Sequence, residues 1–205
     1  MLHRLGWIAF FMTAGMLAGG PYTAWSVRVK PLNLGELTEG ARVIFEGECV
    51  EIRSGKDPVS GLVATWYTFR VTQVLKGEVG KEYVLKQYGG SDGDLHVKVP
   101  AVEYQVGEKL ILFLYGESKL GFSSAVGMQQ GKFSIKEIPE TKVRYVTNGM
   151  PAMLLFENMP TAVVPLNGRG MKAQGTERLR SERLEISEFK QEVQRLVDAQ
   201  KTKER

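Results

Sequence analysis

The feature that most constrains the fold is a two-residue periodicity of apolar side chains, which recurs in short runs along the middle of the chain. Such alternation is typical of β-strands with one buried face. The expected strands cover residues 43–53, 65–75, 81–88, 95–99, 109–115, 121–126 and 131–138. Because the runs follow one another at intervals of roughly ten residues, they predict a small barrel or sandwich of six or seven strands.

Turn-forming residues separate the expected strands. Ser54–Gly61 and Gly89–Asp94 are dense in Gly, Ser and Asp, and both are expected to be exposed loops. Near Gln73 the alternation changes phase, so that Val74 and Leu75 are both apolar, which predicts a β-bulge. No strand–helix–strand repeat of about 30 residues occurs, and its absence argues against a parallel α/β sheet.

The N-terminus has the organisation of a secretory signal peptide. Arg4 supplies a positive charge, residues 5–17 form an apolar segment, and Gly19-Gly20-Pro21 would break a continuous helix. We therefore expect residues 1–26 to be a signal peptide and the protein to be periplasmic or secreted.

Two alternatives stay open at this end of the chain. Cleavage after Ala24 satisfies the preference for small residues as well as cleavage after Ser26 does. The other alternative is an uncleaved anchor, because no charged residue occurs between Leu5 and Val27. Contact with a membrane is expected only in the case of the anchor.

The remainder of the chain is expected to form one domain followed by an extension. Residues 27–140 contain most of the predicted strands and would form the β-barrel domain. Residues 141–205 form the extension, with an edge strand near 144–146 and a proline-rich apolar segment over 150–166. Three prolines exclude a regular helix throughout that segment, so we expect it to lie partly buried over the barrel.

An amphipathic helix is expected near the C-terminus, over about residues 187–200. Ser187 is a suitable N-cap, and Glu188 would interact favourably with the helix dipole. The apolar side chains form one stripe, made of Phe189, Val193, Leu196 and Val197. We expect this stripe to dock on the chain's own barrel, and a face for a partner protein is the alternative.

Charge and reactive residues argue against several functions. The net charge of +4 is small and both signs are interleaved, which does not predict nucleic-acid binding. Cys49 is the only cysteine, so no intramolecular disulfide forms, and we expect a buried, inert thiol.

His96 is the only histidine outside the predicted signal peptide. Because Cys49 is far away in the sequence, His96 predicts neither a zinc site nor a catalytic dyad. The sequence also has no nucleophile elbow and no phosphate-binding loop, so we expect no catalytic residue and no cofactor.

Three residues are candidates for a ligand surface, namely Trp66, Tyr88 and His96. An OB-like barrel often presents its ligand surface on the middle strands, although aromatic residues in a small barrel also serve as core. Asp92 and Asp94 are the calcium candidates, because their loop is similar to one turn of a calcium-binding nonapeptide repeat. Only one copy of that turn is present, which favours a solvated hairpin loop instead.

The order of short motifs between Glu36 and Ile138 carries a family resemblance. The motifs are ARVIFEG at 41–47, VLKG at 74–77, YGG at 88–90, VGE at 106–108, LFL at 112–114 and GMQQGKF at 127–133. This series resembles a group of uncharacterised exported bacterial proteins with a single small β-domain. More distantly, it is similar to the netrin-like domain of tissue inhibitors of metalloproteinases.

The second resemblance implies an OB-type barrel with C-terminal helical elements. It does not extend to the inhibitory mechanism of that family. Those inhibitors chelate the protease zinc through an N-terminal cysteine and are rich in disulfides, whereas this chain has only Cys49.

The sequence therefore predicts a mainly β protein, a small OB-like (Greek-key) barrel with a C-terminal amphipathic helix. The expected function is exported, non-enzymatic binding of a protein or an envelope component. An enzyme inhibitor or small enzyme with its site on the Gly89–Asp94 loop is the alternative, and a purely structural subunit with a long unpaired edge strand is a third. Catalysis would require a cleft in which acids and bases converge, the candidates being Asp92, Asp94, His96 and Glu108.

Overall fold

The computed structural model describes residues 30–159 and 184–203, and the fold is mainly β. Seven strands form one antiparallel sheet in the order β3-β2-β1-β6-β7-β8-β9, and β4 and β5 form a separate two-stranded sheet. The strands are β1 (Val43–Lys56), β2 (Val63–Lys76), β3 (Glu82–Tyr88), β4 (Gly90–Asp92), β5 (Leu95–Val97), β6 (Lys109–Leu114), β7 (Lys132–Glu137), β8 (Arg144–Thr147) and β9 (Leu184–Glu185). The helices are α1 (Leu34–Gly40), α2 (Ala152–Leu155), α4 (Ile186–Lys203) and the 3₁₀ helix η1 (Met128–Gly131).

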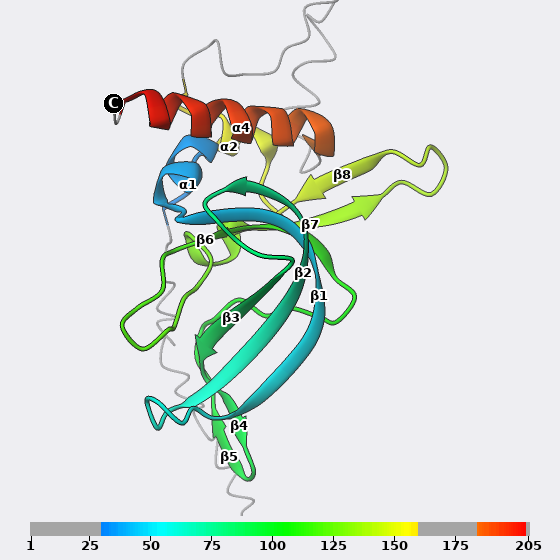
Figure 1. Ribbon diagram of the computed structural model, residues 1–205. Helices are drawn as coiled ribbons and strands as arrows, with labels where there is room; N and C mark the ends of the chain where they lie inside the picture. Colours follow the sequence, from blue (N-terminus) through cyan, green and yellow to red (C-terminus); the bar gives the residue numbers. More distant parts are fainter. Residues whose placement is uncertain (1–29, 160–183, 204–205) are drawn as a thin grey trace, which may run out of the picture.

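The predicted β class and the C-terminal helix are both confirmed. Figure 1 shows the helices gathered at one end of the sheet and the β4–β5 hairpin at the opposite end. β1 and β2 are longer than predicted, because Ser54–Lys56 pair with Val63–Thr65. The turn between them is held by Asp57, whose carboxylate accepts hydrogen bonds from the Ser60 N–H at 2.9 Å and the Ser60 hydroxyl at 2.6 Å.

The irregularity predicted near Gln73 is confirmed. The pairing of β1 with β2 shifts register on either side of this residue, leaving Thr72 and Leu75 without a direct partner, and shifts again at Val50. Such bulges bend a strand and increase its twist. Both strands are therefore strongly curved in Figure 1, and β1 can pair with β2 along its length and with β6 through residues 43–48.

One loop prediction and one strand prediction are wrong. The expected Gly89–Asp94 loop contains β4, which pairs with β5; the strand predicted over 95–99 is present as β5 and ends at Val97. The segment 121–126 is not a strand: it makes two isolated bridges, between Phe122 and Lys86 of β3 and between Ala125 and Leu114 of β6. The segment crosses from one strand to the other and pairs with each at a single residue.

The edges of the main sheet are β3 and β9. Within the described residues no continuous ladder joins β3 to β6, so the closed barrel stays a prediction. The predicted edge strand near 144–146 is present as β8, and it has a further neighbour in β9.

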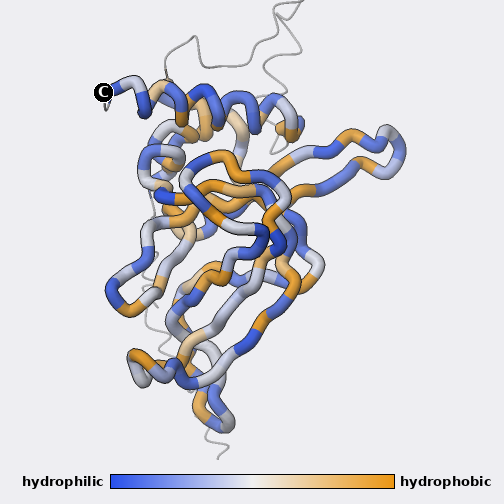
Figure 2. Tube along the Cα trace, in the orientation of Figure 1, coloured by the Kyte–Doolittle hydropathy of each residue, from blue (hydrophilic) through white to orange (hydrophobic). Residues whose placement is uncertain are grey.

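The curved sheet separates two apolar clusters. The first lies between the sheet and the helices, and its members include Leu34, Leu37, Ile44, Ile111, Phe113, Phe133, Val146 and Phe189. The second is formed mainly by β1, β2, β3 and β6, and its members include Phe45, Cys49, Tyr67, Phe69, Leu85, Tyr104, Leu110 and Leu112. Figure 2 shows hydrophobic and hydrophilic residues interleaved along much of these strands, as expected where only one face of a strand is buried.

The C-terminal helix packs on its own sheet, as predicted. Phe189, Val193 and Val197 belong to the first cluster, and Leu196 packs against it half-buried. Burying side chains of this size stabilises the fold by roughly 1.5–3 kcal/mol each. The predicted N-cap is wrong, however: the Glu185 carboxylate accepts the N–H groups of Ser187 and Glu188 at 3.1 and 3.2 Å. Pairing of β9 with β8 places this carboxylate at the first turn of α4.

An ion-pair cluster also ties α4 to the sheet. Glu46 on β1 accepts hydrogen bonds from Arg144 on β8 at 3.0 Å and from Lys190 on α4 at 2.8 Å. Burial of the Glu46 carboxyl opposes its ionisation, but the hydrogen bonds from Lys190 and Arg144 outweigh burial and lower its pKa. Lys190 also donates to the Gln73 side chain of β2 at 2.9 Å, so the cluster connects four elements, β1, β2, β8 and α4.

Several predictions lie outside the described residues. These include the signal peptide of residues 1–26, its alternative cleavage sites and the second half of the proline-rich segment. In the described half of that segment, Leu155 and Phe156 belong to the first cluster, which agrees with a partly buried extension. Among the helices of the described chain, none is long and apolar enough to cross a bilayer.

Candidate functional site

Two adjoining cavities lie at the end of β3, beside the β4–β5 hairpin. The first, here called the hairpin cavity, has a volume of about 520 Å³ and is lined by residues of β2, β3, β4, β5 and the segment after β5. The second, the Phe122 cavity, has a volume of about 390 Å³ and lies on the Phe122 side of that segment. The two cavities share Gln87, Tyr88, Val99 and Ala101. Both volumes fall in the range of small-ligand pockets.

Other hollows of the described surface are explained by structural contacts. A hollow of about 750 Å³ contains Lys76, whose ammonium donates to the Thr38 carbonyl at 2.6 Å and to Gln200 at 2.9 Å. Another, of about 620 Å³, contains Lys132 and Glu108, which form an ion pair at 2.9 Å. Lys76, Lys132 and Glu108 thus bind one another or nearby polar groups of the same chain.

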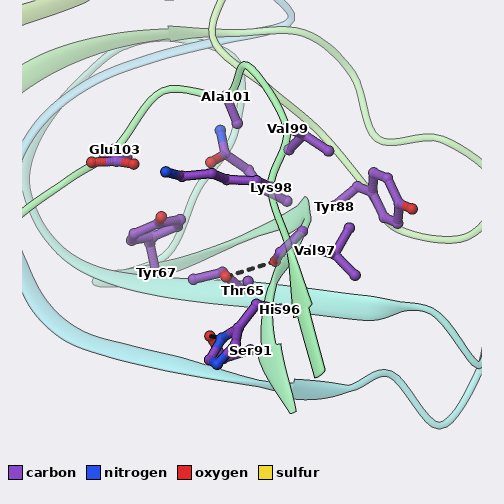
Figure 3. A pocket seen from close by; sticks show the side chains of 13 residues that line it. Thr65, Tyr67, Tyr88, Ser91, His96, Val97, Lys98, Val99, Ala101 and Glu103 are labelled. Atoms are coloured by element: carbon purple, nitrogen blue, oxygen red, sulfur yellow. Dashed lines mark hydrogen bonds between the residues drawn. The ribbon is translucent and has the colours of Figure 1, made fainter. Parts of the chain in front are cut away.

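Antiparallel pairing of β2 with β3 builds the wall of the hairpin cavity. Thr65 lies opposite Gln87 in this pairing, and Thr65, Tyr67 and Gln87 all line the cavity. The chain then leaves β3 through Gly89, whose φ of +96° favours glycine. A Cβ atom at Gly89 would lie 2.8 Å from a methyl group of Val99, so glycine also permits the close approach of the segment after β5. The Thr65 hydroxyl donates to the Gly89 carbonyl at 2.8 Å and fixes this turn (Figure 3).

Two of the three predicted ligand residues lie together at this site. Tyr88 and His96 both line the hairpin cavity. The Tyr88 ring is 45% exposed and stands edge-to-face against Phe122, with ring centroids 6.5 Å apart. Trp66 does not line either cavity: it alternates with Thr65 and Tyr67 along β2, and the Arg53 guanidinium lies 4.8 Å from its ring.

The structure adds Ser91, which the sequence reasoning missed. Ser91 and His96 are cross-strand partners in the β4–β5 hairpin, and the Ser91 Oγ lies 2.7 Å from the His96 Nδ1. Figure 3 shows the two side chains close together at the edge of the cavity. Only the register of the hairpin could have revealed this pair, because the glycine-rich segment was interpreted as a loop.

The acids proposed for catalysis do not converge with His96. Asp92 and Asp94 are exposed and do not line the hairpin cavity. Glu108 lies in a separate hollow, where it accepts the Ser134 hydroxyl at 2.8 Å and pairs with Lys132. In the part of the chain that the structure describes, no three His, Cys, Asp or Glu side chains are grouped as metal ligands are.

The side chains deeper in the site are neutral. Burial, and then the nearby Glu103 carboxylate, raise the pKa of the Tyr67 phenol. Behind Tyr67 lies Tyr104, with ring centroids 4.8 Å apart, and burial is the main cause that raises the Tyr104 pKa. Figure 3 shows Lys98 extended across the cavity toward Glu103 and Tyr67, so the two charges near the cavity have opposite signs.

Gln87 is the most unusual side chain of the site. It is 4% exposed, and neither its amide nitrogen nor its amide oxygen completes a hydrogen bond with the described residues. The Tyr104 hydroxyl is likewise without a partner at full hydrogen-bond geometry, although a weaker interaction with the neighbouring Gln87 amide acts to lower its pKa. The sequence did contain a signal for Gln87, since it falls in phase with the buried Leu85 on β3.

Cys49 is buried, as predicted, and lines neither cavity. Its Sγ is 3.8 Å from the Glu51 carbonyl oxygen. Burial, with the charge of Glu108 as a second cause, raises the pKa of the Cys49 thiol and disfavours the reactive thiolate.

No protein-family model matches this chain, and no curated protein matches it either. The resemblance to netrin-like domains therefore stays a prediction.

Proposed function

We propose that this chain is an exported, non-enzymatic binding module with an OB-like β-domain, and that its ligand surface is formed by the hairpin cavity and the Phe122 cavity. One observation carries the proposal: two cavities of ligand size adjoin and share an exposed aromatic ring, Tyr88. Aromatic and apolar walls with a few polar groups are typical of binding sites. The partner is a protein or another envelope component.

The bridging segment 122–125 supports the OB-like part of the proposal. Its Ser123 N–H donates to the Lys86 carbonyl of β3 at 3.0 Å, and its Ser124 carbonyl accepts the Tyr115 N–H, next to β6, at 3.0 Å. The segment thus fills the space between the first and last strands of the series β3, β2, β1, β6. A partly open barrel of this kind is the arrangement of OB-folds.

The separation of the three candidate catalytic acids from His96 favours binding over catalysis. His96 faces the Ser91 hydroxyl, while Asp92, Asp94 and Glu108 lie outside its cavity. Catalytic sites instead bring such groups into one cleft.

The test compares two aromatic variants. Protein purified from cells that express the full chain is immobilised, exposed to solubilised envelope fraction, and the retained components are quantified by mass spectrometry. Tyr88→Ala is expected to lose the retained components, because it removes the wall that both cavities share. Trp66→Ala, on the other face of β2, is the matched control and is expected to retain them. Equal retention by the two variants would contradict the proposal.

A second candidate function, a small hydrolase, is favoured only by the 2.7 Å contact between Ser91 and His96. In such an enzyme His96 would accept the proton as the Ser91 oxygen attacks an acyl group. A fluorophosphonate probe tests this candidate directly. Labelling of the native protein that disappears in Ser91→Ala would replace the binding proposal with hydrolysis, and absence of labelling would leave binding as the function.

A further inference from the structure

The unpartnered amide of Gln87 requires an explanation. More than nine-tenths of buried polar groups in native proteins have a hydrogen-bond partner, because an unpaired one lowers stability. In the described chain, three buried side-chain atoms lack a partner, and they are the two amide atoms of Gln87 and the hydroxyl of Tyr104. All three therefore belong to one place, next to the cavities already described.

The position of Gln87 points to a ligand rather than to a packing defect. Gln87 lines both cavities and thus lies in the wall between them. Two other shared residues, Val99 and Ala101, belong to residues 98–101, here called the strap. The strap is the part of the chain that separates the hairpin cavity from the Phe122 cavity.

The strap is weakly attached to the rest of the fold. Within the described residues its backbone makes one hydrogen bond, from the Ala101 N–H to the Val99 carbonyl at 2.8 Å, and this bond is internal to the strap. It is held mainly through Val99, which packs against Gly89, and through the buried Val102 that follows it. Segments with few hydrogen bonds to their surroundings open at low free-energy cost. Movement of the strap would join the two cavities and uncover the Gln87 amide.

The chemistry of the uncovered group defines its ligand. A carboxamide offers a donor and an acceptor side by side, and an amide of the ligand offers the complementary pair, so two parallel hydrogen bonds can form. The buried groups around it, Tyr67 and Tyr104, are neutral, and the charges of Lys98 and Glu103 have opposite signs. A charged ligand group placed there would lose its hydration, and the opposite charges of Lys98 and Glu103 would attract and repel it at the same time.

We propose that Gln87 is the recognition residue for a neutral amide group of the ligand, which inserts beneath the strap. This inference rests on the proposed function and names the chemistry that its site recognises. The side-chain carboxamide of a peptide and the N-acetyl group of a sugar both supply such an amide.

The test is a titration of isotope-labelled protein, expressed as the full chain and followed by NMR at the Gln87 side-chain amide. Acetamide is the minimal probe, and acetate is its charged counterpart of nearly the same shape. Acetamide is expected to shift the signals of Gln87 and of the strap in a saturable way, whereas acetate is expected to leave them unchanged. N-acetylglucosamine and the tripeptide Gly-Asn-Gly then distinguish the two sources of the amide. Tighter binding of the sugar would indicate an N-acetyl group, and tighter binding of the tripeptide would indicate a peptide carboxamide.

Two variants test the role of Gln87 itself. Gln87→Glu replaces the donor with a charged acceptor and is expected to weaken probe binding by about tenfold or more, the equivalent of one lost hydrogen bond. Gln191→Glu, at an exposed position on α4, makes the same change of charge away from the site and should bind the probe normally. Gln87→Met keeps the length of the side chain without its polar atoms, so it should fold and fail to bind.

The outcomes separate this inference from the proposed function. Unchanged Gln87 signals with every amide probe, equal binding of acetate and acetamide, or normal binding by Gln87→Met would each overturn the amide proposal. If envelope components are still captured in a Tyr88-dependent way, the binding function stands and only its chemistry is wrong. If amide binding is found but capture does not depend on Tyr88, the partner surface is wrong and the amide site stands.

Discussion

Replacing Gln87 with Met should make the protein more stable. An amide buried without a good hydrogen bond costs roughly 1–3 kcal/mol of folding free energy, and Gln87→Met removes that cost while giving up only the weak interaction with Tyr104. Met has a similar length and adds apolar surface beside Tyr67 and Tyr104. We therefore expect the free energy of unfolding to rise by about 1–2 kcal/mol, after some loss to imperfect packing.

The matched control is a buried glutamine that is fully bonded. Gln130 is 8% exposed, its amide oxygen accepts the Leu32 N–H at 2.7 Å, and its amide nitrogen donates to the Lys30 carbonyl at 3.1 Å. Gln130→Met leaves both backbone groups without these partners and should destabilise the protein by about 1–3 kcal/mol. The same substitution at two buried glutamines is thus expected to raise the free energy of unfolding at Gln87 and to lower it at Gln130.

Urea denaturation followed by circular dichroism gives both free energies, and a change of about 1 kcal/mol corresponds to roughly 2–4 °C in melting temperature for a protein of this size. The reasoning fails if Gln87→Met destabilises the protein as much as Gln130→Met does. That result would mean that the Gln87 amide is hydrogen-bonded in solution, for example to an ordered water. The polar side chain would then stabilise the fold rather than recognise a ligand.

Three further perturbations have defined outcomes. Glu46 has a lowered pKa in the folded protein, so it stabilises the fold above its ordinary pKa of 4.5 and loses this contribution as the pH falls through the folded value. Glu46→Gln should therefore lower stability at neutral pH by about 1–3 kcal/mol and flatten the acid dependence measured by thermal melting at a series of pH values. Gly89→Ala should lower the melting temperature and change the NMR signals of residues 98–101, because a Cβ at a φ of +96° would lie 2.8 Å from Val99; unchanged signals would argue against the close packing of the strap. The buried Cys49 thiol, with its raised pKa, should react with a disulfide reagent only after unfolding by urea, and rapid reaction of the native protein would contradict its burial.

The sequence predicted those elements whose burial follows a regular period. β1 and β2 have apolar residues in a core on one or both faces, and the stripe of α4 lies in the first cluster, so these residues recur at the spacing of a strand or a helix. The segment 121–126 also contains buried apolar residues, Ala125 and Val126, but their burial does not require a continuous hydrogen-bonded ladder. The short β4 could not be predicted because glycine-rich residues carry no periodicity at all.

The candidate site was predicted only in part. Tyr88 and His96 lie at one cavity, whereas Trp66 faces the other side of β2, and alternation along that strand could have separated it from Tyr67. Ser91 depended on a cross-strand register, which a single sequence does not specify. Gln87 could have been predicted, because the sequence shows a polar residue in phase with buried neighbours on the same strand. Such a residue indicates a site more specifically than an aromatic residue does.

The alternation of β1 has a consequence for how the whole molecule responds to a perturbation. Neighbouring residues of this strand belong to different clusters, Ile44 to the one under the helices and Phe45 to the one beside the cavities. β6 does the same, with Phe113 in the first cluster and Leu112 in the second. Neither cluster can melt while the strands that form both remain in place, so unfolding should be a single cooperative transition. A ligand bound at the hairpin end would then raise the temperature at which α4 unfolds at the opposite end, although the ligand contacts no residue of α4.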